Sequence, residues 1–297
     1  MPAASMRLGD IAARRFVDNG ALPVYAVAAL LASFIVGTLA TGLFTYDRAL
    51  FAGFVPAIIV FLLVAFAIRW VGFARLAGTI EAIMLFLLVA FLAPLCAVIL
   101  ASTNLPLADD VLVRFDLSMF GVYRPALIAM FDAQPWLKAP TTAIYNTLSV
   151  QPFALLILLF AIRRVQLAWT MLGAWAIALA ISLAVFTLFP AHGDINQVVQ
   201  FVHVLDAARD GSLRRLDAET LTGIITFPSF HAAAALILAW TFAQLGRLAR
   251  PMVALNLVMI VSAMFVGGHY FVDLVAGCAV AAAAILIARW CQSRLRA

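Results

Sequence analysis

Long apolar runs separated by short polar segments make up most of this chain. A helix that crosses a bilayer needs about 20 predominantly apolar residues, and eight runs qualify. They are residues 22–44, 49–68, 79–100, 140–162, 166–189, 229–246, 251–267 and 269–289, of which the sixth and seventh are the shortest. The pattern predicts an all-α, polytopic membrane helical bundle of about eight transmembrane helices.

The composition supports a single integral membrane domain over residues 1–297. The chain is 66% hydrophobic and 11% charged, with a mean hydropathy of +1.10. We divide it into N-terminal spans with an outer interfacial loop, residues 1–139, and a catalytic core, residues 140–297. The first three spans are expected to form a scaffold or a lipid-facing wall. Glu81 lies near a membrane boundary, where an acid is tolerated, and a structural role is expected for it.

The net charge of +5 reflects membrane topology, and we expect no nucleic-acid partner. Eight spans place both chain ends and three short loops on one side, where 12 of the 19 lysines and arginines lie with only two acids. The opposite loops carry seven basic and ten acidic residues. By the positive-inside rule, the termini are expected in the cytoplasm, the protein in the inner (cytoplasmic) membrane, and the two long loops on the outer side.

These two long loops carry short helical patterns and basic residues. In the first, residues 101–139, apolar positions at helical spacing predict short helices on the membrane surface. Arg124 could bind a phosphate there or be an ordinary solvated arginine. The second, residues 190–227, predicts an amphipathic helix, with Asp194 and Gln197 spaced as a capping box. The turn after this helix carries three cations, Arg209, Arg214 and Arg215.

All four histidines map to the predicted outer side. His192 either lines a site or is an interfacial residue, and His203 falls on the polar face of the predicted helix. His269 and Asp273 are four residues apart, so on a helix they share one face and can touch. The carboxylate can then orient the imidazole and fix its tautomer, which makes the ring a plausible nucleophile or base.

The fourth histidine, His231, belongs to the stretch Pro228-Ser229-Phe230-His231, which opens the sixth apolar run. Proline is favoured in the first turn of a helix, so Ser229 and the unpaired backbone N–H groups are expected to form an anion site at a helix N-terminus. Alanine-rich runs in this helix and in the last one allow close approach. Close approach would bring His231 and His269 together at the outer interface.

These residues resemble the type 2 phosphatidic acid phosphatase superfamily, whose second and third signatures are P-S-G-H and S-R-x5-H-x3-D. Here they are residues 228–231, and Ser262-Ala263 followed by His269 and Asp273. The resemblance covers residues 190–290, and it implies a six-helix phosphatase-type core.

The resemblance also implies phosphoryl transfer through a phosphohistidine. His269 would attack phosphorus and Asp273 would orient it. His231 would protonate the leaving oxygen and then activate water or an alcohol, while Ser229 would hold a phosphate oxygen. The histidines lack a metal-ligand spacing, so no metal or cofactor is expected.

The chain departs from the family pattern at its cations. The arginine of the third signature is Ala263 here, and the glycine of the second is Phe230. The first signature, K-x6-R-P, is absent, and the nearest match, Lys138 followed by Tyr145 and Asn146, lies a full pair of spans too early. Because a phosphoryl transition state needs cations or dipoles, Arg124, Arg209, Arg214 or Arg215 must substitute, or the substrate carries less charge.

In lacking these arginines, the chain is similar to the branch of inositol phosphorylceramide synthases and sphingomyelin synthases. These enzymes pass phosphodiester head groups to lipid alcohols. The expected function is therefore a membrane lipid phosphatase or phosphotransferase acting at the outer leaflet on a phospholipid or polyprenyl phosphate. Transfer to an alcohol and hydrolysis both stay open.

Two alternatives also stay open. A lipid transporter or flippase for polyprenyl phosphates should have polar groups along the middle of several spans, whereas Glu81 and Asp273 lie near span ends. A vanadate-dependent haloperoxidase shares the superfamily's fold, but it should keep the oxyanion-binding lysine and arginine that are absent here.

Overall fold

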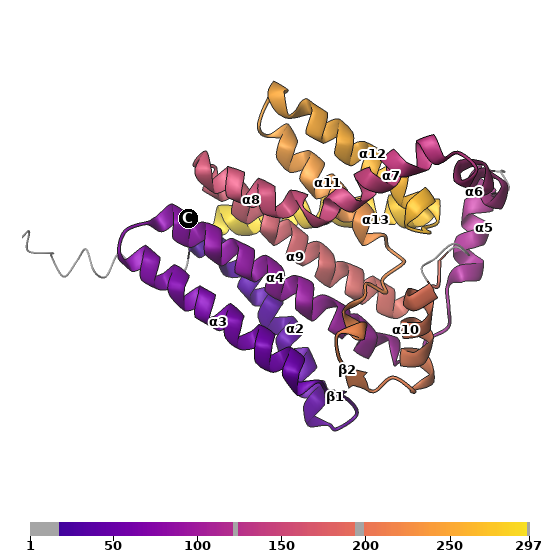
Figure 1. Ribbon diagram of the computed structural model, residues 1–297, viewed down its shortest axis with the longest axis horizontal. Helices are drawn as coiled ribbons and strands as arrows, with labels where there is room; N and C mark the ends of the chain where they lie inside the picture. The colour runs from indigo at the N-terminus through magenta and orange to yellow at the C-terminus, as the bar shows by residue number, and fades with distance from the viewer. Residues whose placement is uncertain (1–17, 121–123, 194–198, 296–297) are drawn as a thin grey trace, which may run out of the picture.

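The described chain is almost entirely helical, which confirms the all-α prediction. The structure, a computed structural model, describes residues 18–120, 124–193 and 199–295. Long helices pack side by side, with shorter helices gathered at one end (Figure 1). One small addition is a parallel pair of two-residue strands, β1 (Thr45–Tyr46) and β2 (Arg215–Leu216).

The helices alternate between long spans and short connecting pieces. The first part contains η1 (Asn19–Ala21), α2 (Leu22–Ala40), α3 (Arg48–Trp70), α4 (Ala74–Ala101), α5 (Asp109–Phe120) and α6 (Arg124–Asp132). The middle contains α7 (Pro135–Asn146), η2 (Thr147–Ser149), α8 (Gln151–Ala161), α9 (Val165–Leu188) and α10 (Val199–Asp210). The last part contains η3 (Glu219–Leu221), α11 (Phe230–Ala243), η4 (Arg247–Ala249), α12 (Arg250–Val266) and α13 (Phe271–Arg294).

Each of the eight predicted runs contains a helix, but the helices differ in their ability to span a membrane. Within the described residues, six are long and apolar enough, and the pair α7–η2 and α8, bent by 52°, raises the number to seven if it counts as one span. Helix α11 has 14 residues, or about 21 Å at 1.5 Å per residue, which is short for a core of about 30 Å. The chain is a multi-pass membrane protein, and the eighth span stays a prediction.

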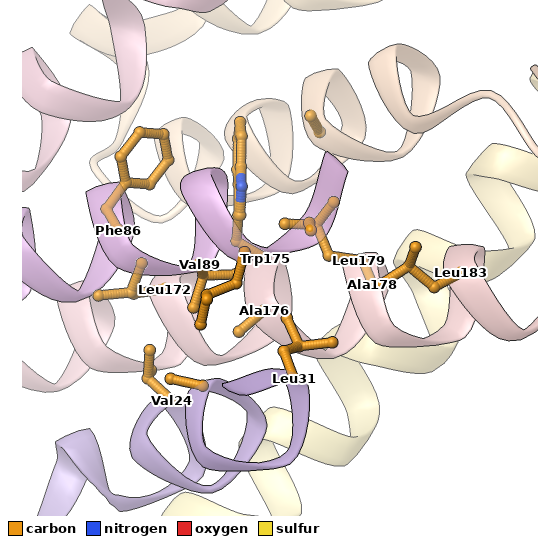
Figure 2. Packing of buried hydrophobic residues seen from close by; sticks show 14 of the residues in the cluster. Val24, Leu31, Phe86, Val89, Leu172, Trp175, Ala176, Ala178, Leu179 and Leu183 are labelled. Carbon is orange, nitrogen blue, oxygen red and sulfur yellow. The ribbon is translucent and has the colours of Figure 1, made fainter. Parts of the chain in front are cut away.

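The core lies where α9 meets α2 and α4. Figure 2 shows Trp175 and Leu179 of α9 packing with Leu31 of α2 and Val89 of α4. In an 18-residue apolar stretch of α4, 61% of the residues are buried, whereas only 11% are buried in the corresponding stretch of α3. The first three spans are therefore not a uniform wall, because α4 is a core helix and α3 lies at the periphery. The division at residue 139 stays a prediction, and α4 packs against α8 and α9 across it.

Glu81 joins three of the N-terminal helices. Its carboxylate, 2% exposed, forms an ion pair of 2.6 Å with Arg69 at the end of α3. It also accepts a hydrogen bond of 2.9 Å from the Tyr25 hydroxyl of α2. A buried charge requires such partners, and this network agrees with the structural role predicted for Glu81.

The two ends of the bundle have different contents. At one, which we call the loop end, α11 and α13 begin, α9 ends, and α5 and α10 lie close by (Figure 1). The opposite end, where α13 finishes, we call the terminal end. Helix α10 buries Phe201 and Leu205 and leaves His203 exposed, as predicted, while it packs against α4. The predicted capping box at Asp194 and Gln197 lies outside the described residues.

Candidate active site

His269 and Asp273 are in contact at the loop end. The Nδ1 atom of His269 lies 3.4 Å from Oδ2 of Asp273, and both side chains are buried, at 5% and 0% exposure. This distance is longer than a typical hydrogen bond, and such contacts often tighten when substrate binds. Among the described residues, the second carboxylate oxygen, Oδ1, has no hydrogen-bond partner. The pairing anticipated from the four-residue spacing is present.

The reason for the contact differs from the one predicted. His269 is not helical, because α13 begins at Phe271 with Tyr270 as its N-cap. Asp273 is therefore the third helical residue, and its Oδ2 also accepts the Tyr270 backbone N–H at 2.9 Å. The Asp273 carboxylate therefore links the start of α13 to the imidazole of His269, which precedes the helix. The expectation that the two residues share a helical face is wrong for His269.

Asp116 of α5 holds the first turn of α13 from outside the helix. Its two carboxylate oxygens accept the backbone N–H groups of Phe271 and Val272 at 2.8 and 3.0 Å. Helix N-termini leave such groups without intrahelical partners, and Asp116 is itself only 7% exposed. The sequence alone does not predict this role, because a capping residue 155 positions away leaves no local signal.

His192 belongs to a neighbouring polar network. Its Nε2 atom lies 2.6 Å from Oδ1 of Asp206, and its backbone N–H donates to Asp109 at 3.0 Å. Asp109 also accepts the Tyr270 hydroxyl at 3.3 Å. The structure thus connects His192 to the segment that carries His269 through Asp109 and Tyr270. Whether His192 contacts substrate stays a prediction.

Ser229 caps α11 and is tied directly to α13. Its hydroxyl accepts the Ala232 N–H at 3.3 Å, and its own N–H donates to the Asp273 carbonyl at 3.0 Å. Ser229 is completely buried and Pro228 precedes the cap. The expectation that proline lies in the first turn of the helix is therefore wrong. The cap links the two signature stretches.

A glycine allows this close approach. A Cβ atom at Gly277 of α13 would collide with the Ser229 carbonyl oxygen and would lie 3.1 Å from the Ala232 side chain. The alanines at 232–235 are all fully buried, as are Ala281 and Ala284 of α13. Small residues therefore bring α11 against α13, as predicted. His231, the second residue of α11, follows the Ser229 cap that donates to Asp273, so it lies at the same end of this helix pair as His269.

Tyr145 of α7 is the residue that sequence reasoning missed at this site. Its ring stacks on the His231 ring, with 4.2 Å between centroids and 9° between planes. A Cβ atom at Gly267 would lie 2.8 Å from the Tyr145 hydroxyl and 3.0 Å from Cδ2 of His269. The phenol oxygen and the His269 ring thus border the same small space. No hydrogen bond of this hydroxyl occurs in the described structure.

Tyr145 also corrects the treatment of the missing first signature. The stretch from Lys138 to Asn146 lies a full pair of spans before the other signatures in the sequence, yet α7 brings Tyr145 to the ring of His231. Tyr145 packs against a buried cluster that includes Ala263, which stands where the family has an arginine. Lys138 is instead half exposed and forms an ion pair of 2.7 Å with Asp132.

The other departure from the signatures, Phe230, is partly buried and packs against the hydrophobic core. Its ring meets the Trp175 ring of α9 edge to face, with 5.4 Å between centroids. The side chain anchors the start of α11 to α9. A glycine at this position would leave that contact unfilled.

The predicted cations have partners elsewhere. Arg215 forms an ion pair of 2.7 Å with Asp47, and Arg214 lies over the Phe44 ring at 5.1 Å. Hydrogen bonds from the Leu50 and Ala49 amides and from Arg215 lower the pKa of Asp47. These contacts hold both arginines at the start of α3. Arg209 donates to the Leu105 carbonyl at 2.7 Å, and the side chain of Arg124 lies outside the described part of the structure.

An apolar groove of about 390 Å³ adjoins the site between α6, α7 and α12. Its lining includes Thr141, one turn before Tyr145 on α7, and Ser262, next to Ala263. The rest is apolar: Leu127, Met130, Phe131, Leu137, Val258, Val261 and Phe265, with Gln134. Such a surface suits a hydrocarbon chain. Over the described residues, no group of three or more histidine, cysteine or acidic side chains could hold a metal ion.

Comparison with protein families gives one match. The family model described as PAP2 superfamily matches residues 110–287, more than half of the chain. The matched range begins in α5 and extends upstream of the two signature stretches, so it includes Asp116 and Tyr145. No curated protein and no solved structure matches the chain.

Proposed function

This chain belongs to the PAP2 superfamily, and from that premise we propose that it is a membrane lipid phosphatase or phosphotransferase that works through a phosphohistidine. Membership supports a phosphatase-type function, and the helices support a substrate within the bilayer. The observation that carries the proposal is the buried His269–Asp273 pair, with His231 held at the same helix end by the hydrogen bond between Ser229 and Asp273. A covalent step needs an activated nucleophile and a separate acid, and this arrangement supplies both.

In the first step, His269 is the nucleophile. With Nδ1 directed at Asp273, Nε2 would attack phosphorus, and the bond from phosphorus to the alcohol oxygen would break. His231 would give its proton to that oxygen. The Asp273 carboxylate would stabilise the positive charge that develops on the His269 ring, as carboxylates do for catalytic imidazoles.

In the second step, His231 changes role. Having lost its proton, it would accept one from water or an alcohol as that oxygen attacks the phosphohistidine. The P–N bond then breaks and His269 returns to its neutral form. Ser229, fixed as the α11 cap, would hold a phosphate oxygen through its hydroxyl proton, together with the N–H groups of the first helical turn.

Tyr145 would supply part of the missing oxyanion binding. Its phenol has no hydrogen-bond partner in the described structure and borders the space next to His269, and the residue packs against the cluster that includes Ala263. A neutral donor stabilises developing negative charge without the full charge of an arginine. This favours a substrate phosphate with a single negative charge, such as a phosphodiester head group, with transfer to a lipid alcohol. Arg124, Arg209, Arg214 and Arg215 stay candidates for a closed, substrate-bound state.

The apolar groove beside Tyr145 supports a lipid substrate. One acyl or prenyl chain would lie between α6, α7 and α12 while the phosphate reaches His269. By the positive-inside rule, the site would face the outer leaflet and the termini the cytoplasm.

Trapping the intermediate tests this proposal. The purified protein is mixed with a phosphorus-32-labelled lipid and quenched in alkali, because phosphohistidine is acid-labile. His269→Ala should form no adduct. His231→Ala should accumulate it when the substrate has a good leaving group, since the first step then needs no acid. Turnover by His269→Ala would exclude the mechanism, and lipid flipping without turnover would favour a transporter.

A further inference from the structure

A basic pocket lies at the terminal end of the bundle. It is formed by the turn between α8 and α9, the start of α9 and the last turns of α11 and α13. Its volume is about 570 Å³, within the usual range for ligand sites of about 300–1,000 Å³. At 1.5 Å per residue, Arg289 in the pocket lies about 24 Å along α13 from Asp273. The pocket is therefore separate from the histidine site.

All the charged side chains that line this pocket are positive. Its lining contains three arginines, Arg163, Arg164 and Arg289, and no acidic residue. Within the described structure, none of the three guanidinium groups has an acidic partner. The other polar side chains of the lining are neutral: Gln166, Gln244, Gln292, Ser293 and Thr170. An anion would relieve the mutual repulsion of three cations that have no acidic partner among the described residues.

The backbone around these arginines also suits an anion. Arg163 has a φ of 63°, in the left-handed region, at the end of α8, where glycine is the usual residue. The chain thus has a cation at a position where a flexible residue is normally favoured. The first turn of α9, Val165 to Leu167, lines the same pocket. Its N–H groups and the positive end of the helix dipole favour negative charge.

We propose that this pocket binds the phosphate-bearing head group of an anionic phospholipid from the leaflet at the terminal end. Guanidinium groups bind phosphate oxygens through paired hydrogen bonds, and basic pockets between transmembrane helices bind anionic head groups. Trp240 also lines the pocket, and tryptophan is favoured at the membrane interface. A free phosphate ion would contact only the three arginines, whereas a phospholipid would also contact Trp240.

Native mass spectrometry of the purified full-length chain in detergent tests this site. The protein is titrated with phosphatidylglycerol, phosphatidylcholine or inorganic phosphate. Phosphatidylglycerol should bind at least about tenfold more tightly than phosphatidylcholine, because basic residues near a lipid surface favour anionic head groups. The triple variant Arg163→Ala, Arg164→Ala and Arg289→Ala should lose this preference, and Arg289→Ala alone should lose part of it.

A matched triple variant controls for overall charge. Arg75, Arg247 and Arg250 are exposed at the same end but do not line the pocket, so replacing them with alanine should leave the preference intact. Equal losses in both triple variants, or no loss in either, would overturn the proposal. Displacement of phosphatidylglycerol by inorganic phosphate at equal concentration would assign the pocket to free phosphate instead. Lipid binding is read without turnover, so the result is independent of the phosphohistidine mechanism.

Discussion

The ring of Tyr145 stacks face to face on the ring of His231, with 4.2 Å between their centroids and 9° between their planes. The two residues are 86 positions apart, and they meet because α7 returns along α12 to the start of α11. The stack fixes the plane of the proposed acid–base imidazole. It also directs the phenol toward the space that borders His269.

Tyr145→Phe separates these two roles, because it keeps the ring and removes only the hydroxyl. We expect kcat to fall by about 10²- to 10³-fold, the usual effect of removing one oxyanion donor. The melting temperature should change little. Tyr46→Phe, at a half-exposed position in β1, is the control and should behave as wild type. Full activity of Tyr145→Phe would show that the phenol is not a donor.

Tyr145 is proposed to act as a neutral donor where the family signatures have arginines, and this predicts the charge of the preferred substrate. Tyr145→Arg should shift preference from phosphodiester toward phosphomonoester lipids, because the doubly charged monoester gains more from a full cation. The ratio of kcat/KM for the two substrate classes measures this. An unchanged ratio would indicate that charge recognition depends on other groups, with Arg124 the first candidate.

The sequence allowed the spans and the two signature stretches to be predicted, because hydropathy and short motifs are local properties. The partners that complete the site were not predictable in this way. Asp116 caps α13 from 155 positions away, and Tyr145 reaches His231 from another helix. Even the predicted pair of His269 and Asp273 forms for a different reason, since the helix begins two residues after the histidine. Helix starts depend on capping partners, which only the fold brings together.

Asp116→Asn tests whether the cap positions His269. The two amides of Phe271 and Val272 are bound by a charged carboxylate, and loss of a cap costs about 0.5–2 kcal/mol of stability. We expect a lower melting temperature together with a reduced kcat and a nearly unchanged KM. Asp110→Asn, exposed on the same helix, should leave both unchanged. If Asp116→Asn lowers stability while kcat is retained, Asp116 supports the fold without positioning the nucleophile.

Asp273→Asn tests the orientation of the nucleophile. The amide can still contact Nδ1, but it cannot stabilise the charge that develops on the ring, and it offers a donor where an acceptor is needed. The rate of adduct formation in single-turnover experiments should fall by about 10²- to 10⁴-fold, as for loss of acid–base assistance. Adduct formation at the wild-type rate would exclude Asp273 from the chemical step.

Gly267→Ala tests the small space between Tyr145 and His269. The added methyl group would lie 2.8 Å from both the Tyr145 hydroxyl and the Ala263 carbonyl oxygen, so the ring, the backbone or both must shift. Overpacking of this kind costs about 1–3 kcal/mol, and displacement of either ring should reduce kcat strongly. Gly53→Ala in α3, where no heavy atom lies within 4 Å of the new methyl group, is the matched control. If Gly267→Ala retains full activity, the phosphate cannot occupy this space, and the proposed roles of Tyr145 and His269 would be wrong together.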